Sequence, residues 1–255
     1  MRLIVSPAKG MAAEGPALLP LGEPAFLAEA ERITAALRAM APAELQRLWK
    51  TSDALTEKAL GALDAWTPDG RAPAVLAYRG IQYTRMAPSV MTEDELSYLE
   101  EHLCILSGLY GALRPFDAVA PYRLEMGARL AVDGAHGRCR DLYGFWGPRL
   151  ARELFPEGTG LLVNVASKEY ARAVLPWLAP GVRCVTCLFG TVRDDGRWVQ
   201  RATAAKEARG TFVRWCAEQG VESEEELAAF DRGGYGLDAD RSSDDGATLV
   251  FTRRL

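Results

Sequence analysis

Six short apolar runs, separated by stretches of helical periodicity, constrain the fold more than any other feature of this 255-residue chain. The runs occupy residues 2–5, 74–78, 161–165, 183–189, 197–203 and 248–252. Short apolar runs bounded by turn residues are typical of buried strands, and their alternation with helices is typical of α/β folds. Asp194-Asp195-Gly196 predicts a hairpin between two of them, so the sheet should be mixed. We therefore predict one compact α/β domain over residues 1–255, with some α+β character and helices surrounding the mixed sheet.

Helices are predicted where apolar residues recur at helical spacing, as they do in residues 25–40, 53–66 and 204–219. Thr92 and Ser223 are each followed three residues later by Glu, which is the capping-box pattern that begins a helix. The helix that begins after Thr92 is expected to run directly into the segment that follows residue 106.

Charge and composition limit the classes of protein to which this chain can belong. Thirty Lys and Arg residues stand against 34 Asp and Glu residues, a net charge of −4, so any site for a polyanion must be local. No apolar run approaches the roughly 20 residues that span a bilayer, and a strand-like run begins at Leu3 without a signal-peptide core. Five cysteines at low density suit a reducing compartment. We expect a cytoplasmic protein with no membrane partner.

Residues 106–127 are the least generic segment of the chain and the predicted functional centre. Gly108 and Gly111 bracket a Leu-Tyr pair, and two prolines follow, so the backbone turns repeatedly. A core strand would not carry these prolines or so many charges, because proline lacks a ladder donor and buried charges need partners. We predict a packed loop that presents the charged residues Arg114, Asp117, Arg123 and Glu125.

Further polar and cationic residues lie where predicted strands or turns end. Lys9 lies just past the first strand, and Asn164 and Ser167 lie where a strand passes into a helix, a usual place for ligand groups in α/β folds. Lys206 and Arg209 are three apart on one helical face. We predict that a single positively charged cleft collects eight side chains, namely Lys9, Arg114, Arg123, Glu125, Asn164, Ser167, Lys206 and Arg209.

Several of these features also have an ordinary structural interpretation. Glu125 can pair with Arg123, Asp117 can cap a turn, and exposed cations are often solvated. Aromatic residues beside the cations can stack on bases or belong to the core.

Metal and cofactor chemistry has little support in the sequence. Cys184 and Cys187 point to opposite faces of a predicted strand, so they cannot readily chelate one ion or form a disulfide. His102 and His136 lack carboxylate or cysteine partners at ligand spacing. We expect no metal site, no cofactor and no histidine-based triad.

Short motifs spread over nearly the whole chain carry a resemblance to a known family. Besides residues 106–127, they are Ser6-Pro7-Ala8-Lys9, Asp141-Leu142-Tyr143, Phe145-Trp146-Gly147, Asn164, Ala166-Ser167, Glu169-Tyr170, Lys206, Ala208-Arg209-Gly210, Phe230 and Gly234-Tyr235. In content and order they closely resemble the YaaA family, bacterial cytoplasmic proteins linked to peroxide stress. The resemblance implies a protein that binds DNA through a helix-hairpin-helix element and limits oxidative damage and intracellular iron.

The first functional hypothesis is therefore a DNA-binding stress protein. The turn from Gly108 to Gly111 would form a helix-hairpin-helix-like element near residues 92–127, whose backbone N–H groups would hold a DNA phosphate without reading the base sequence. This turn has two residues between its glycines, where the usual hairpin of this type has one. Binding of this kind is non-specific and sensitive to salt.

The second hypothesis is an enzyme that acts on a nucleotide, a nucleoside or another anionic small molecule. Asp117, Glu125 or Lys9 would then provide acid–base catalysis. Both hypotheses use the same predicted binding residues, which are Ser6, Lys9, Gly108, Gly111, Arg114, Arg123, Asn164, Ser167, Lys206 and Arg209.

Overall fold

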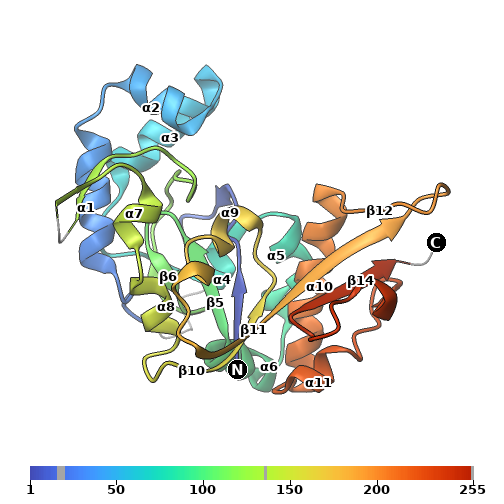
Figure 1. Ribbon diagram of the computed structural model, residues 1–255. Coiled ribbons are helices and arrows are strands. Elements are labelled where there is room, and N and C mark those ends of the chain that lie inside the picture. The colour runs from blue at the N-terminus through green and yellow to red at the C-terminus, as the bar shows by residue number, and fades with distance from the viewer. Residues whose placement is uncertain (16–20, 135–136, 254–255) are drawn as a thin grey trace.

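The computed structural model describes residues 1–15, 21–134 and 137–253, and a mixed sheet lies at its centre (Figure 1). In spatial order its strands are β13 (Tyr235–Leu237), β14 (Thr248–Arg253), β11 (Gly181–Val192), β10 (Thr159–Asn164), β1 (Arg2–Val5), β5 (Leu103–Ser107) and β6 (Gly111–Leu113), with β12 (Trp198–Val199) paired to β11. The strands from β14 to β5 are parallel, and β13, β6 and β12 pair antiparallel to their neighbours. The predicted mixed α/β fold is confirmed.

Helices flank this sheet, with α1 to α3 at the left of Figure 1 and α10 and α11 at the right. They are α1 (Leu27–Arg38), α2 (Pro42–Trp49), α3 (Asp53–Ala65), α4 (Ala74–Ala77), α5 (Ile81–Met86), α6 (Glu93–His102), α7 (Leu142–Trp146), α8 (Arg149–Leu154), α9 (Lys168–Ala171), α10 (Ala202–Gln219) and α11 (Glu224–Leu227). Short two-stranded ladders join β2 (Gly10–Met11) to β4 (Tyr78–Arg79), β3 (Ala72–Pro73) to β7 (Ala118–Val119), and β8 (Val132–Gly134) to β9 (Gly137–Cys139). No described helix is long and apolar enough to cross a membrane.

Four of the six predicted strands form as β1, β10, β11 and β14, and the predicted hairpin joins β11 to β12. The prediction at residues 74–78 is wrong, because this buried Ala-rich run forms the single turn of α4. The prediction at residues 197–203 holds only for Trp198–Val199, since α10 already begins at Ala202. A short apolar run does not distinguish a strand from a buried helical turn, and only the neighbouring elements do so.

Both predicted capping boxes are present and begin α6 and α11. At α6, the backbone N–H of Glu95 donates to Thr92 Oγ1 at 3.3 Å, and the backbone N–H of Thr92 donates to Glu95 Oε2 at 2.9 Å. Ser223 and Glu226 repeat the arrangement at α11. These local signals depend only on residues three apart, so they survive in any tertiary environment.

The prediction of a helix-hairpin-helix-like element near residues 92–127 is wrong. α6 passes directly into β5, and the partner of β5 across the turn is the strand β6, not a second helix. In that turn the backbone N–H groups of Leu109 and Tyr110 donate to Ser107 Oγ at 3.1 and 2.9 Å, so they are not free to hold a phosphate. A strand forms here because β1 offers a parallel ladder that buries every residue of β5.

The cysteines and histidines that were considered as metal ligands have ordinary surroundings in the part of the chain that the structure describes. Cys187 is buried and Cys184 is partly buried, and both are free thiols on β11. The His102 ring lies 3.0 Å from the carbonyl oxygen of Met1, whereas His136 lies outside the described residues. Among the described residues, no three His, Cys, Asp or Glu side chains are grouped so that they could hold a metal ion.

Candidate functional site

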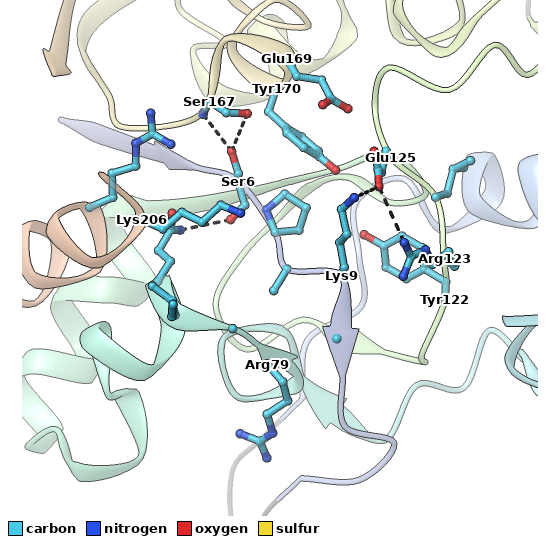
Figure 2. Close-up of a pocket in the computed structure, with 18 residues that line it drawn as sticks. Ser6, Lys9, Arg79, Tyr122, Arg123, Glu125, Ser167, Glu169, Tyr170 and Lys206 are labelled. Atoms are coloured by element: carbon cyan, nitrogen blue, oxygen red, sulfur yellow. Dashed lines mark hydrogen bonds and ion pairs between the residues drawn. The ribbon is translucent and has the colours of Figure 1, made fainter. Parts of the chain in front are cut away.

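A pocket of about 490 Å³ lies next to the carboxyl ends of β1 and β10 (Figure 2). Its lining consists of residues 6–10, 79–82 and 122–125 with Ser167, Glu169, Tyr170, Lys206 and Arg209. Parallel strands release the chain at the same edge of a sheet, so the segments that follow β1 and β10 meet there although about 160 positions separate them. The pocket therefore occupies the usual ligand position of an open α/β sheet.

Ser6 and Ser167 join the two strand ends at the floor of the pocket. The backbone N–H of Ser167 donates to Ser6 Oγ at 2.9 Å, and the Ser6 hydroxyl donates to Ser167 Oγ at 3.2 Å (Figure 2). The carbonyl oxygen of Ser6 accepts from Gln82 Nε2 at 3.2 Å and from the Tyr83 hydroxyl at 3.0 Å. Ser6 is therefore held from the segment after β10 on one side and from α5 on the other.

Lys9, Arg123 and Glu125 form a charged group on the other side of the pocket. Lys9 Nζ lies 2.5 Å from Glu125 Oε1, and the Arg123 guanidinium lies 4.0 Å from the same oxygen (Figure 2). The Lys9 side chain is 65% exposed and that of Arg123 only 18%. Arg123 Nε is buried without a hydrogen-bond partner among the described residues. The sequence interpretation of Glu125 as an ion-pair partner is thus confirmed, within a pocket rather than on an open surface.

Lys206 and Arg209 line the pocket from α10, as their spacing on one helical face predicts. Lys206 is exposed at the rim, whereas only 9% of Arg209 is accessible to solvent. Arg209 Nε has no hydrogen-bond partner among the described residues, and burial lowers the pKa of this guanidinium. A buried cation without a counter-charge is costly, so this residue is the most unusual feature of the site.

Glycine determines how closely α10 approaches α5. A Cβ atom added at Gly210 would lie 2.0 Å from the carbonyl oxygen of Gln82 and 2.9 Å from Cβ of Arg85. Only a residue without a side chain fits at this contact. Gly210 therefore places Arg209, the preceding residue, against the α5 side of the pocket.

The structure brings together seven of the predicted site residues and leaves five outside the pocket. The seven are Ser6, Lys9, Arg123, Glu125, Ser167, Lys206 and Arg209, and the five are Gly108, Gly111, Arg114, Asp117 and Asn164. The predicted convergence is therefore wrong for Arg114 and Asn164. Arg114 is exposed elsewhere, and buried Asn164 shapes the loop before Ser167, its Oδ1 accepting from the backbone N–H of Ala166 at 3.1 Å.

Gly108 and Gly111 are packing residues of the β5–β6 turn. A Cβ atom at Gly108 would lie 2.8 Å from the carbonyl oxygen of Leu124, and one at Gly111 would lie 2.8 Å from the Trp146 ring. Gly111 also has a φ of +73°, which favours glycine. These glycines let the hairpin pack closely, Gly108 against the backbone of Leu124 and Glu125, and neither glycine lines the pocket itself.

Asp117 caps a turn, which is the structural interpretation that its sequence position allowed. Its Oδ2 accepts from the backbone N–H of Arg114 at 2.8 Å, and the residue is 3% exposed. Burial raises the pKa of this carboxyl to about 6, although the N–H and the charge of Arg114 oppose the shift. Asp117 lies outside the pocket lining and cannot act on a ligand there.

The buried Asp117 carboxyl predicts a pH-dependent stability. Its folded pKa lies above its ordinary value of 3.8, so the folded state favours the protonated form and loses stability as pH rises toward 6. The wild type should lose this stability and Asp117→Asn should not. As pH rises from about 4 to about 7, we therefore expect the unfolding free energy of Asp117→Asn to increase by about 2 kcal/mol relative to that of the wild type. Urea unfolding at several pH values measures this gain. Asp64→Asn, at an exposed position of α3, is the control, and an equal profile for both variants would contradict the prediction.

The lining residues that were not predicted as site candidates include Arg79, Glu169 and Tyr170. Arg79 is an exposed cation next to Gly80, the same pattern that drew attention to Lys9, and it could have been included on that basis. Glu169 and Tyr170 stood within a family motif but had no assigned role. Glu169 Oε1 accepts from the backbone N–H of Gly127 at 2.8 Å, which connects the segment after β10 to the end of the central loop.

Comparison with known proteins agrees with the family resemblance that the motifs carry. The model of a family described as "Peroxide stress protein YaaA" matches residues 1–241. A UPF0246 protein of Pediococcus pentosaceus is 42% identical over 256 residues, covering 99% of this chain and 98% of the relative. A UPF0246 protein of Limosilactobacillus fermentum is 43% identical over 254 residues, covering 99% of this chain and 100% of the relative. A UPF0246 protein of Desulfitobacterium hafniense is 39% identical over 256 residues, covering 100% of this chain and 99% of the relative. The chain therefore belongs to the YaaA family of peroxide stress proteins.

Proposed function

We propose that this protein serves in the cytoplasmic response to peroxide by binding a phosphate-bearing nucleotide unit, free or as part of a DNA strand, in the pocket. The observation that carries the proposal is the concentration of cations there. Five basic residues line the pocket, against the two acids Glu125 and Glu169, in a chain whose net charge is −4. The five are Lys9, Arg79, Arg123, Lys206 and Arg209.

Three of these cations form no ion pair within the described part of the chain, although the side chain of one of them, Arg79, points away from the other labelled residues in Figure 2. Arg79, Lys206 and Arg209 take part in none of the ion pairs found among the described residues. Arginine forks and lysine ammonium groups are the usual protein partners of phosphate. Unpaired cations in a cleft also raise the local concentration of anions, which compensates for the acidic character of the whole chain.

The size and lining of the pocket suit a nucleotide. Small-molecule sites usually occupy about 300–1,000 Å³, and this pocket falls in that range. The rings of Tyr122 and Tyr170 line it beside the cations and offer aromatic surface to a base. A DNA strand would contact the exposed rim cations Lys9, Arg79 and Lys206, and the β5–β6 turn would take no part in binding.

Catalysis on the bound ligand is a second candidate function, favoured by the contact between Lys9 and Glu125 inside the pocket. A carboxylate can accept a proton from a ligand bound beside the pair, and the neighbouring ammonium group can donate one to it. A step of this kind would require Glu125, so Glu125→Gln should abolish turnover while leaving ligand affinity largely intact. Binding without any chemical change of a nucleotide would leave only the first function.

Lys206→Ala is expected to weaken the binding of a labelled oligonucleotide or of ATP about tenfold and to reduce the salt dependence of binding by about one phosphate contact. Lys206 is exposed at the rim, so the variant should fold normally. Fluorescence anisotropy at several salt concentrations measures both quantities. Lys58→Ala on α3, which removes an exposed lysine that does not line the pocket, is the matched control.

The two lysine variants also test the stress role in cells. A strain that lacks this protein should lose viability in peroxide, and the gene for the Lys58→Ala variant should restore survival better than the gene for Lys206→Ala. If Lys206→Ala and Lys58→Ala bound every nucleotide probe with equal affinity, the pocket would not be the binding site. Unchanged peroxide survival of the deletion strain would remove the stress role.

A further inference from the structure

Arg209 is a largely buried cation for which the described residues provide no ion-pair partner. It is more than nine-tenths buried, it lines the pocket, and its Nε has no partner within the described part of the chain. No described carboxylate forms an ion pair with it, in contrast to Arg123, which faces Glu125. Desolvation of an unpaired guanidinium is unfavourable, so a compensating anion is expected to come from a ligand.

The surroundings of Arg209 are closely packed, which suits recognition of a small group. Gly210 packs against the backbone of Gln82, and the side-chain amide of Gln82 in turn donates to the carbonyl oxygen of Ser6. The α10 segment, α5 and the end of β1 are therefore mutually positioned. A ligand group that reaches Arg209 meets a guanidinium whose location is already determined by packing.

The serine pair adds a directed hydrogen-bond donor to the same pocket. The Ser167 N–H donates to Ser6 Oγ, and the Ser6 hydroxyl donates to Ser167 Oγ. The Ser167 hydroxyl hydrogen then has no acceptor among the described residues and is free to donate to a ligand oxygen. Arginine and serine donors together match the several acceptor oxygens of a phosphate group.

We infer that the pocket recognises a terminal phosphate, a phosphate monoester at the end of a nucleic-acid strand or on a nucleoside monophosphate, and that Arg209 is the residue that selects it. This inference rests on the proposed function and narrows its ligand class. A phosphodiester inside a strand continues as chain on both sides, so it reaches rim cations more easily than a guanidinium that is nine-tenths buried. A terminal phosphate enters with one attachment and carries a second negative charge near neutral pH.

Two oligonucleotides of one sequence, each labelled at the 3′ end, test the inference. One carries a 5′-phosphate and the other a 5′-hydroxyl. Wild-type protein should bind the phosphorylated strand about 10- to 100-fold more tightly, the range given by hydrogen bonds to a charged group. Competition with AMP and with adenosine shows whether a free nucleotide, as well as a strand end, supplies the phosphate. Tighter binding of either the phosphorylated strand or AMP than of its unphosphorylated counterpart supports the inference.

Arg209→Gln should abolish the preference for the phosphorylated strand, bringing the two dissociation constants together. Arg214→Gln, on the same helix but paired with Glu218 away from the pocket, should keep the preference. Equal binding of both strands by the wild type, with no advantage of AMP over adenosine, overturns the inference while the proposed function stands. Absence of all nucleotide and oligonucleotide binding overturns the proposed function itself. The wild-type comparison decides the matter even if Arg209→Gln does not fold.

Discussion

Gly210→Ala is expected to lower the free energy of unfolding by about 3 kcal/mol, which is the cost of forcing an extra methyl group into a closely packed contact. The new Cβ would lie 2.0 Å from the carbonyl oxygen of Gln82, and a backbone oxygen cannot move aside as the end of a flexible side chain can. This loss outweighs the gain in helix propensity that alanine normally brings. Urea unfolding followed by tryptophan fluorescence measures the difference.

The same substitution at Gly61 provides the matched control. Gly61 lies within α3, is exposed, and has no atom within 4 Å of an added Cβ. Gly61→Ala should therefore raise the unfolding free energy by about 0.5–1 kcal/mol, because alanine restricts the unfolded chain and favours the helix. If the two variants changed stability in the same direction, the close approach of α10 to α5 would not exist in solution. The placement of Arg209 would then lose its structural basis.

Phe189→Ala should cost about 3–5 kcal/mol of unfolding free energy, the range for deleting a large aromatic side chain from a core. Phe189 on β11 is fully buried and contacts four other rings at centroid distances of 5.3 to 5.9 Å. One of them belongs to Phe212 on α10, so this cluster packs the helix that carries Lys206 and Arg209 onto the sheet. The variant should lose ligand affinity along with stability, because both depend on the position of α10.

Phe189→Leu separates loss of volume from loss of aromatic contacts and should cost clearly less than the alanine variant, since most of the cavity stays filled. Trp177→Ala removes a larger ring from a side chain that is 48% exposed, and it should change stability by less than about 1 kcal/mol. A cost at Phe189 no greater than that at Trp177 would show that the aromatic cluster does not anchor α10.

The pocket depends on elements that are stable for independent reasons. Ser6 and Ser167 at its floor follow β1 and β10, and each of these strands is hydrogen-bonded on both sides within the parallel part of the sheet. The cations come from α10, from β4 and from two loops of the chain. Exposed residues such as Lys206 can therefore change without loss of the fold, which is why the binding and stability predictions use different positions.

Several features could be predicted from the sequence because they depend on residues close together in the chain. The strands β1, β10, β11 and β14, the hairpin after Val192 and the capping boxes at Thr92 and Ser223 follow from local apolar runs and short polar motifs. The shared face of Lys206 and Arg209 follows from helical periodicity alone.

Other features required the tertiary structure, because distant segments decide them. Residues 103–107 carry leucines at helical spacing and still form a strand, since β1 provides a ladder and complete burial for them. Arg114 and Asp117 lie in the same segment as Arg123 and Glu125, but the prolines turn the chain so that only the latter pair reaches the pocket. Arg209 is buried with no counter-charge among the described residues, and its position depends on the packing of α10 against α5 at Gly210, a contact that no local pattern encodes. The sequence by itself determined which residues are charged and where several strands and capped helices lie. Only the tertiary structure decided which of those charges meet in one pocket, because that depends on the packing of segments far apart in the chain.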